Sequence, residues 1–160
     1  MLFGHLALAV LEHRYLKADL APVIMGGIFP DLIDKTLCHV IGITPNGRTI
    51  AHTLLGLGLS TLLLGLVRGR RTAWSWGLGY LGHLLGDFNG PVPWLYPFVK
   101  YDFPPSLGLA ESISRLMSNP AKATPDVLLS AWAIGATRKQ IAEAMRKGAG
   151  DTQSGELLET

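Results

Sequence analysis

The sequence IAHTLLGLGLSTLLLGLV, at residues 50–67, sets the architecture that we expect for this chain. The segment carries no formal charge along its whole length, and its polar side chains are those of His52, Thr53, Ser60 and Thr61. A helix needs roughly 20 predominantly apolar residues to cross a bilayer. The segment therefore predicts a helix of nearly spanning length.

A second apolar segment follows the short basic stretch RGRRT at residues 68–72. It runs from about residue 73 to residue 88 and is rich in tryptophan and glycine. Two apolar segments joined by so short a turn predict an antiparallel helical hairpin. Two further helices are expected over residues 2–16 and 20–34, so the chain should contain two such hairpins.

The composition supports a membrane-embedded helical protein. Of the 160 residues, 48% are hydrophobic and 16% are charged, whereas soluble domains carry about 25% charged residues. We expect an all-α fold, with a membrane-embedded bundle of two antiparallel hairpins followed by a C-terminal helical region. A net charge of +2 is too small to indicate a nucleic-acid partner. The lone Cys38 excludes an intramolecular disulfide and any zinc site built from several cysteines.

The C-terminal third divides into a loop, a helical region and a tail. Residues 89–105 hold five prolines, which prevent long helices, and their interleaved aromatic side chains suit a membrane interface. An apolar helix is expected over residues 126–136, and the sequence TRKQ at 137–140 predicts a capping box that opens another helix. We expect residues 1–147 to form a single membrane-associated domain and residues 148–160 to be a disordered tail.

The sequence GHLLGDF, at residues 82–88, places a histidine and a carboxylate in an apolar run. His83 and Asp87 are four residues apart, so on a helix both side chains lie on one face. A buried imidazole and carboxylate are costly unless something binds both, and a divalent metal is the usual candidate. The alternative is a hydrogen bond that only holds two helices together.

Counting along the hairpin places a third polar side chain near that pair. His52 precedes the turn at Arg70 by 18 positions (70 − 52). His83 and Asp87 follow that turn by 13 positions (83 − 70) and 17 positions (87 − 70). At about 1.5 Å per residue, all three lie roughly 20–27 Å from the turn. The hairpin therefore predicts that these side chains meet at one end.

The first two helices give the same result. Counted from a turn near Ala18, His5 and Asp31 lie at equal separations on either side, 13 positions away (18 − 5 and 31 − 18). Asp34 follows Asp31 three positions later. Two hairpins packed with their turns together would bring three histidines and three aspartates to one end of a four-helix core. Helical bundles build metal sites in this way, from side chains on facing helices.

Each of these residues also has a simpler interpretation. His5 could be a surface residue near the N-terminus. Asp31 and Asp34 could be helix caps around a proline, and Asp34 could pair with Lys35. Arg48 could hold an anionic substrate, orient an aspartate or anchor a helix at the membrane interface.

The candidate residues belong to an ordered set of motifs. The motifs are GH at residues 4–5, FPDLID at 29–34, RTIAHT at 48–53 and LGYLGHLLGD at 78–87, followed by GPVPWLYP at 90–97. Over roughly residues 1–105 the set resembles the YdjM-type family of inner-membrane proteins, which are described as membrane-bound metal-dependent hydrolases. The resemblance implies a multi-pass location in the inner (plasma) membrane. It also implies five metal ligands, namely His5, Asp31, His52, His83 and Asp87.

The chain departs from the family pattern at two places. The family often has its paired aspartates two residues apart, whereas Asp31 and Asp34 are three apart, a spacing that still suits one helical face. Gly47 precedes Arg48 where the family pattern has a histidine. Either a ligand is lost at Gly47, or a histidine was never essential at that position.

The expected function is that of a membrane-bound metal-dependent hydrolase. A metal with one open position lowers the pKa of bound water and polarises a carbonyl or phosphoryl oxygen. Ligands of nitrogen and oxygen without a thiolate favour Zn²⁺, with Mn²⁺ or Fe²⁺ as alternatives. Six candidate ligands leave room for a second metal or for an aspartate as general base. We expect Asp34 and Arg48 to be the catalytic residues.

The basic residues suggest an orientation and a substrate. Arg14 and Lys17 lie at one turn and three arginines lie at the other, which by the positive-inside rule places both turns in the cytoplasm. The polar cluster then faces the opposite membrane surface. The expected partners are membrane lipid and a small-molecule or lipid substrate, and the expected reaction is hydrolysis of an ester or phosphoester in a membrane-derived or amphiphilic molecule.

Two other interpretations stay open on the sequence alone. A non-enzymatic membrane protein that binds metal or translocates ions would also place histidine and aspartate within its helices. A soluble helical protein with a very apolar core would suit the other predicted helices, which are short for a bilayer about 30 Å thick.

Overall fold

The computed structural model describes residues 2–87, 90–105, 114, 118 and 124–138. The first hairpin consists of α1 (Leu2–Leu16) and α2 (Leu20–Lys35), and a π-helical turn, η1 (Thr36–Ile41), continues α2.

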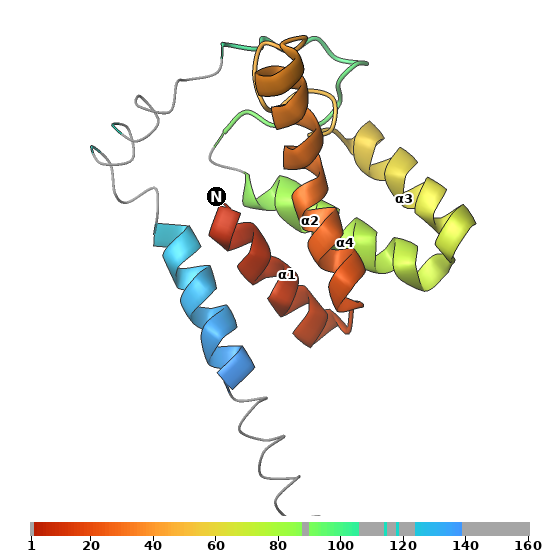
Figure 1. Ribbon diagram of the computed structural model, residues 1–160, viewed down its shortest axis with the longest axis vertical. Coiled ribbons are helices and arrows are strands. Elements are labelled where there is room, and N and C mark those ends of the chain that lie inside the picture. Colours follow the sequence, from red (N-terminus) through yellow and green to blue (C-terminus); the bar gives the residue numbers. More distant parts are fainter. Residues whose placement is uncertain (1, 88–89, 106–113, 115–117, 119–123, 139–160) are drawn as a thin grey trace, which may run out of the picture.

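The second hairpin consists of α3 (Leu54–Arg68) and α4 (Arg70–Gly86), joined through Gly69. Gly69 has a φ of 87°, a backbone conformation that glycine adopts without strain. Another helix covers residues 124–138 and lies beside α1 (Figure 1). The described residues contain helices and no strand, which confirms the all-α prediction.

The two hairpins pack with their turns together. Arg71, at the start of α4, donates from Nε to both carboxylate oxygens of Asp19 at 3.0 Å. The backbone N–H of Asp19 donates to Ser75 Oγ at 2.8 Å. These bonds join the α1–α2 turn to the α3–α4 turn, so the polar ends of both hairpins lie at the other end of the bundle.

α4 is the central helix, and it packs against α1, α2 and α3. Glycines bring α2 and α4 unusually close together. A Cβ on Gly79 would lie 1.9 Å from the carbonyl oxygen of Val23, and one on Gly26 would lie 2.3 Å from that of Trp76. The helix backbones therefore touch directly, as small residues allow.

α3 lies at the edge of the bundle. Among the labelled elements, it contacts α4 alone. None of its 15 residues is buried. Leu59, Leu62, Leu63 and Leu66 on its outer side are 59–78% exposed. Figure 1 shows this helix standing away from α1 and α2.

The expected helix over residues 50–67 is shorter than predicted, and its expected near-spanning length was wrong. Thr53 caps α3, because its Oγ1 accepts a hydrogen bond from the Gly56 N–H at 2.9 Å. Residues 50–53 form a non-helical loop. Within the described parts of the chain, no helix has both the length and the apolar character to cross a membrane.

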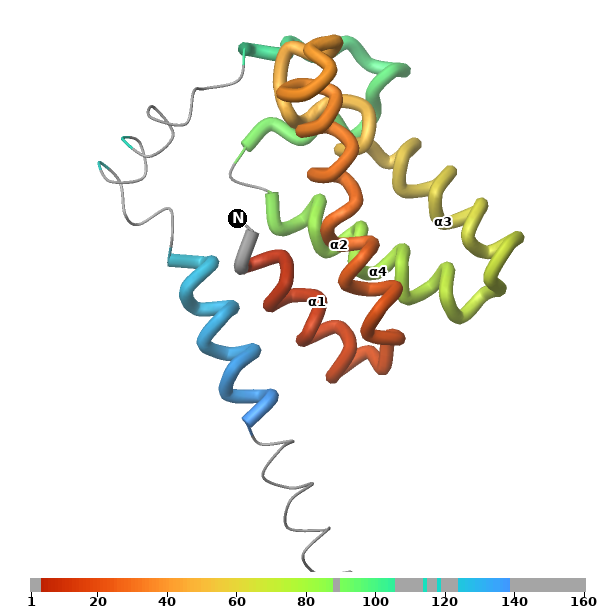
Figure 2. Tube along the Cα trace, in the orientation of Figure 1, coloured from red at the N-terminus to blue at the C-terminus, as the bar shows by residue number. Residues whose placement is uncertain are grey.

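Residues 90–105 form the expected loop, which contains no helix. The loop runs past the start of α3 (Figure 2). The Leu54 N–H donates to the Trp94 carbonyl at 2.9 Å, and the Asn46 side chain donates to the Pro104 carbonyl at 2.9 Å. The loop is therefore attached to the same end of the bundle as the polar residues.

The helix at residues 124–138 covers one side of α1. Ala7 and Leu11 of α1 pack against Ala133 and Ala136 of this helix. The predicted capping box at residue 137 was wrong, because Thr137 lies inside the helix and its hydroxyl donates to the Ala133 carbonyl at 2.8 Å. The rest of the helix predicted after that box and the tail predicted at residues 148–160 lie outside the described residues.

Candidate metal centre

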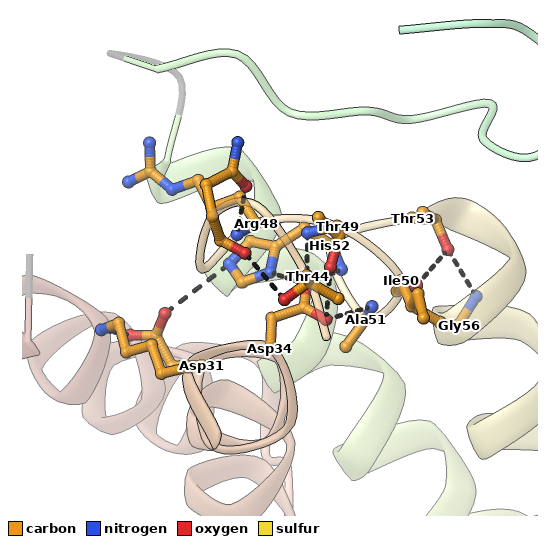
Figure 3. Close-up of polar contacts among 12 residues, drawn as sticks. Asp31, Asp34, Thr44, Arg48, Thr49, Ile50, Ala51, His52, Thr53 and Gly56 are labelled. Carbon is orange, nitrogen blue, oxygen red and sulfur yellow. Dashed lines mark hydrogen bonds and ion pairs between the residues drawn. The ribbon is translucent and has the colours of Figure 1, made fainter. Parts of the chain in front are cut away.

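Asp34, near the end of α2, organises the loop that precedes α3. Its carboxylate accepts hydrogen bonds from the backbone N–H groups of Thr49, Ala51 and His52 at 2.6, 3.0 and 3.1 Å. It also accepts from the Thr49 hydroxyl at 3.2 Å and from His52 Nδ1 at 2.8 Å. Figure 3 shows the Asp34 side chain pointing into this loop. These donors occupy the lone pairs that a carboxylate offers.

The pairing of Asp34 with His52 shifts both pKa values. Burial alone would raise the pKa of Asp34, but the bonds from His52 and from the backbone of Ala51 and Thr49 hold it below its usual value. Burial alone would lower the pKa of His52, but the carboxylates of Asp34 and Asp87 raise it. The two carboxylates therefore favour a cation beside the His52 ring, either a proton or a metal ion.

His83 is anchored on the opposite helix by a backbone carbonyl. Its Nδ1 lies 2.6 Å from the carbonyl oxygen of Gly27 in α2. The close approach of α2 and α4 makes this contact possible. The pKa of His83 is lowered to about 4, first by burial and then by the nearby His5.

The two anchored imidazoles face each other through their remaining nitrogens. His52 Nε2 and His83 Nε2 lie 3.2 Å apart. A carboxylate and a carbonyl accept the two Nδ1–H groups, and a neutral imidazole has one N–H, so both Nε2 atoms present lone pairs. Lone pairs at this distance repel each other unless a proton or a metal ion lies between them.

Two carboxylates also lie close to these two nitrogens. Asp31 Oδ1 lies 3.6 Å from His52 Nε2 and 3.9 Å from His83 Nε2. Asp87 Oδ2 lies 3.5 and 3.9 Å from the same two nitrogens. Ligand atoms about 2.1 Å from a tetrahedral ion lie about 3.4 Å from one another. The observed separations therefore suit one shared ion.

His5 joins the cluster from α1. Its ring centroid lies 3.9 Å from that of His83, and its Nε2 lies 3.4 Å from Asp87 Oδ1. His5 is buried, and neither of its ring nitrogens has a hydrogen-bond partner. Gly86 leaves room for this ring, because a Cβ there would lie 3.0 Å from His5 Cδ2.

These side chains form two sets of three potential ligands. One set is His5, His83 and Asp87, and the other is Asp31, His52 and His83. Because Nδ1 of His83 is held by a carbonyl, both sets rely on its Nε2, and one nitrogen binds one ion. The described residues therefore fit a single centre of nitrogen and oxygen ligands, which we call the His–Asp cluster.

Asp87 is the more buried of the two carboxylates in the cluster, with 2% of its side chain exposed against 13% for Asp31. Both of its oxygens are buried without a well-directed hydrogen bond, although Arg48 Nε lies 2.7 Å from Oδ2. Burial alone would raise the pKa of Asp87, but His5, His52 and the Arg48 guanidinium hold it well below its usual range. A buried anion whose oxygens lack directed donors is a suitable ligand for a cation.

Arg48 lies at the outer edge of the cluster, with 35% of its side chain exposed. Its backbone N–H donates to Asn46 Oδ1 at 2.9 Å. Gly90 lies against the guanidinium, because a Cβ at that residue would be 1.9 Å from Nη1. Arg48 thus connects the buried cluster with the surface formed by the loop at residues 90–105.

The structure brings together all seven residues singled out in the sequence, but it gives Asp34 a different position from the ligands. Asp34 is 0% exposed, and hydrogen bonds to the loop engage both of its oxygens. We interpret it as a residue that orients His52, and its expected catalytic role stays a prediction. The ligand roles of the other five and the catalytic role of Arg48 stay predictions.

Sequence reasoning missed two supports of the cluster. The Gly27 carbonyl that holds His83 carries no side-chain signal. Lys35, which donates to Asp31 Oδ2 at 2.6 Å, was weighed only as a partner of Asp34. The spacing of four residues between Asp31 and Lys35 could have indicated this pair.

Gly47, where the chain departs from the family pattern, lies away from the cluster. A Cβ on Gly47 would first meet Lys35 Cγ at 3.2 Å and His39 Nε2 at 3.9 Å. A side chain at this position therefore starts beside α2 and η1, and none of the five potential ligands is among its nearest neighbours.

Comparison with known proteins places the chain in a family. No curated protein and no solved structure matches it. A family model described as YdjM inner membrane protein matches residues 1–143. The match confirms the resemblance seen in the motifs, and the chain belongs to the YdjM inner membrane protein family.

Proposed function

We propose that this protein is a membrane-bound metal-dependent hydrolase that acts on an ester or phosphoester of a membrane-derived or amphiphilic substrate. The single observation that carries the proposal is the 3.2 Å distance between Nε2 of His52 and Nε2 of His83. Two carboxylate oxygens lie within 3.9 Å of both nitrogens. A divalent cation neutralises this concentration of lone pairs and negative charge.

The chain's own residues prepare the site for such an ion. Asp34 and the Gly27 carbonyl fix the tautomers of His52 and His83 with Nε2 free, as acceptors behind the ligands do in metal sites. A divalent ion such as Zn²⁺ would supply a polarised water and a Lewis acid for the substrate oxygen. Arg48, at the exposed edge, would hold an anionic oxygen of the substrate.

The outer face of α3 supports a substrate from the membrane. Its leucines form an uncharged surface that begins at Leu54, two residues after His52 in the chain. Exposed apolar surface of this extent is typical of an interaction with lipid or another protein. In an inner membrane protein family, we infer that this face contacts the bilayer and that the cluster lies where amphiphiles can reach it.

The basic turns favour one orientation of the molecule. Arg68, Arg70 and Arg71 are exposed at the end opposite the cluster, and positive residues near membrane segments favour the cytoplasmic side. The cluster would then face outward. Cys38 is the only cysteine of the chain and lies in η1 near the cluster end, so labelling it in intact cells with a membrane-impermeant maleimide tests this orientation.

The function is tested with purified protein in detergent. We expect bound Zn²⁺, Mn²⁺ or Fe²⁺ by elemental analysis, together with turnover on a panel of phosphoesters and lipid esters. Turnover should disappear after chelation and return when the metal is added back. Undiminished turnover after complete metal removal would overturn the proposal.

Two further outcomes separate hydrolysis from its alternatives. Stoichiometric metal without turnover on any substrate would indicate a metal-binding or ion-translocating protein instead. Replacement of Asp19, which lies at the opposite end, by Asn is the matched control for loss of an aspartate. This variant should keep both the metal and the turnover, whereas Asp87→Asn should lose both.

A further inference from the structure

A shallow surface pocket lies beside the exposed edge of the His–Asp cluster. It is lined by Arg48 and Asn46, and by Pro91, Tyr101, Asp102 and Phe103 of the loop that follows α4. Arg48 is the one lining residue that also contacts a potential ligand, through its Nε 2.7 Å from Asp87. A molecule in the pocket would therefore touch the same guanidinium that borders the cluster.

The walls of the pocket are held in place by contacts within the protein. The Asn46 side chain donates to the Pro104 carbonyl at 2.9 Å. The Tyr101 hydroxyl accepts a hydrogen bond from the Leu95 N–H at 3.3 Å. The Phe103 ring packs edge-on against Tyr96, with ring centroids 5.4 Å apart. The pocket is thus built from a loop that is fixed at several points.

The pocket carries two opposite charges that do not pair with each other. Arg48 forms its ion pair with Asp87. Asp102 is exposed and has no ion pair within the described part of the chain. Two aromatic residues flank Asp102 in the sequence and line the same pocket. An exposed carboxylate in a pocket that aromatic residues also line is a favourable environment for an organic cation.

The geometry points to a substrate that is a phosphoester carrying a protonated amine, with its phosphoryl oxygens at Arg48 and its amine at Asp102. Guanidinium groups bind phosphate through directed, charge-assisted hydrogen bonds. Tyr101 and Phe103 would contact the carbon atoms next to the ammonium group. The inference rests on the proposed function for the location of the reacting bond, and it narrows the substrate from esters in general to zwitterionic phosphoesters.

Binding is measured separately from hydrolysis. The probes are O-phosphoethanolamine, which carries an amine, and glycerol 3-phosphate, which does not. Each is titrated into the protein, and its affinity is measured by calorimetry. We expect the amine-bearing probe to bind about two- to fivefold more tightly, the range that an exposed ion pair provides. Asp102→Asn should abolish this preference and leave the affinity for glycerol 3-phosphate unchanged.

Two variants control for general electrostatic effects. Lys100→Gln changes the charge of the same loop, and this residue does not line the pocket, so the preference should persist. Arg48→Lys keeps the positive charge but loses the paired N–H donors of the guanidinium group, so it should weaken the binding of both probes equally. If Asp102→Asn keeps the full preference for the amine, the inference is wrong.

Failure of the inference can be told apart from failure of the proposed function. Amine-dependent binding without turnover would reject the hydrolase and keep the pocket assignment. Turnover of phosphoesters without any effect of the amine would keep the hydrolase and reject the pocket assignment. Vesicles with and without phosphatidylethanolamine, compared with the soluble probe, distinguish a lipid head group from a free amine phosphoester as the source.

Discussion

α3 and α4 are partners in one hairpin, yet they use apolar residues in opposite ways. α3 is almost purely apolar, and none of its residues is buried. α4 carries arginine, serine, tyrosine and histidine, and eight of its 17 residues are buried. The more apolar helix is therefore the outer one. Water-soluble proteins usually bury their most apolar segments, so the difference accords with the proposed contact between α3 and lipid.

The strongest test of this comparison removes a potential ligand from α4. His83→Ala should abolish stoichiometric metal binding, because it removes the nitrogen that both ligand sets share. Leu62→Ala, on the exposed face of α3, is the control and should keep the metal. Elemental analysis of the purified variants measures the outcome, with circular dichroism to show that each is folded. Full metal content in folded His83→Ala would contradict the site.

Asp34→Asn tests whether Asp34 supports the cluster by orienting His52. An amide offers one oxygen acceptor in place of two, so it cannot accept from Thr49, Ala51 and His52 together. Metal affinity should fall by about 10–100-fold, as for other supporting partners of metal ligands. Competition with a fluorescent chelator measures this change. An unchanged affinity would show that Asp34 does not orient His52.

A pair of glycine substitutions compares the packing of the two helices. Gly79→Ala places a Cβ 1.9 Å from the Val23 carbonyl and should lower the free energy of unfolding by about 1–3 kcal/mol, the usual cost of overpacking. Gly58→Ala on α3 meets nothing within 4 Å and should raise it by about 0.5–1 kcal/mol through helix propensity. Denaturation in detergent measures both. Equal effects would remove the contrast between the helices.

The smallest expected effect concerns the face of α4 that meets α1. The Glu12 carboxyl packs against Gly82, and burial raises its pKa to about 7 from 4.5. The folded protein therefore holds a proton that the unfolded chain releases, so stability falls as pH rises from about 4.5 to about 7. Glu12→Gln should have a melting temperature a few degrees higher at pH 8 and nearly unchanged at pH 4. An equal increase at both pH values would exclude titration of Glu12 as the cause.

The sequence predicted the helices and their pairing better than their ends. Counting residues from the turns placed His5, His52 and His83 at one end of the bundle, because helix rise is constant along each element. The start of α3 could not be found by counting. It depends on hydrogen bonds from residues 49–52 to Asp34, which is distant in the sequence.

The side chains of the site could be predicted from the sequence, but the groups that hold them in position could not. Histidine and aspartate in apolar segments are conspicuous, so the convergence of the cluster followed from their positions. The Gly27 carbonyl belongs to the backbone, and every residue has such a group. Only the close crossing of α2 and α4, which Gly26 and Gly79 permit, decides which carbonyl reaches His83.

The contact between His5 and Asp87 has a consequence for the entropy of the unfolded chain. These residues are 82 positions apart (87 − 5), and with one cysteine the chain has no internal disulfide to close that loop. An ion held between them would act as a cross-link, which in the loop-closure description disfavours the unfolded chain by on the order of 4 kcal/mol. Chelation would then remove one of the links between the two hairpins, instead of loosening a single helix.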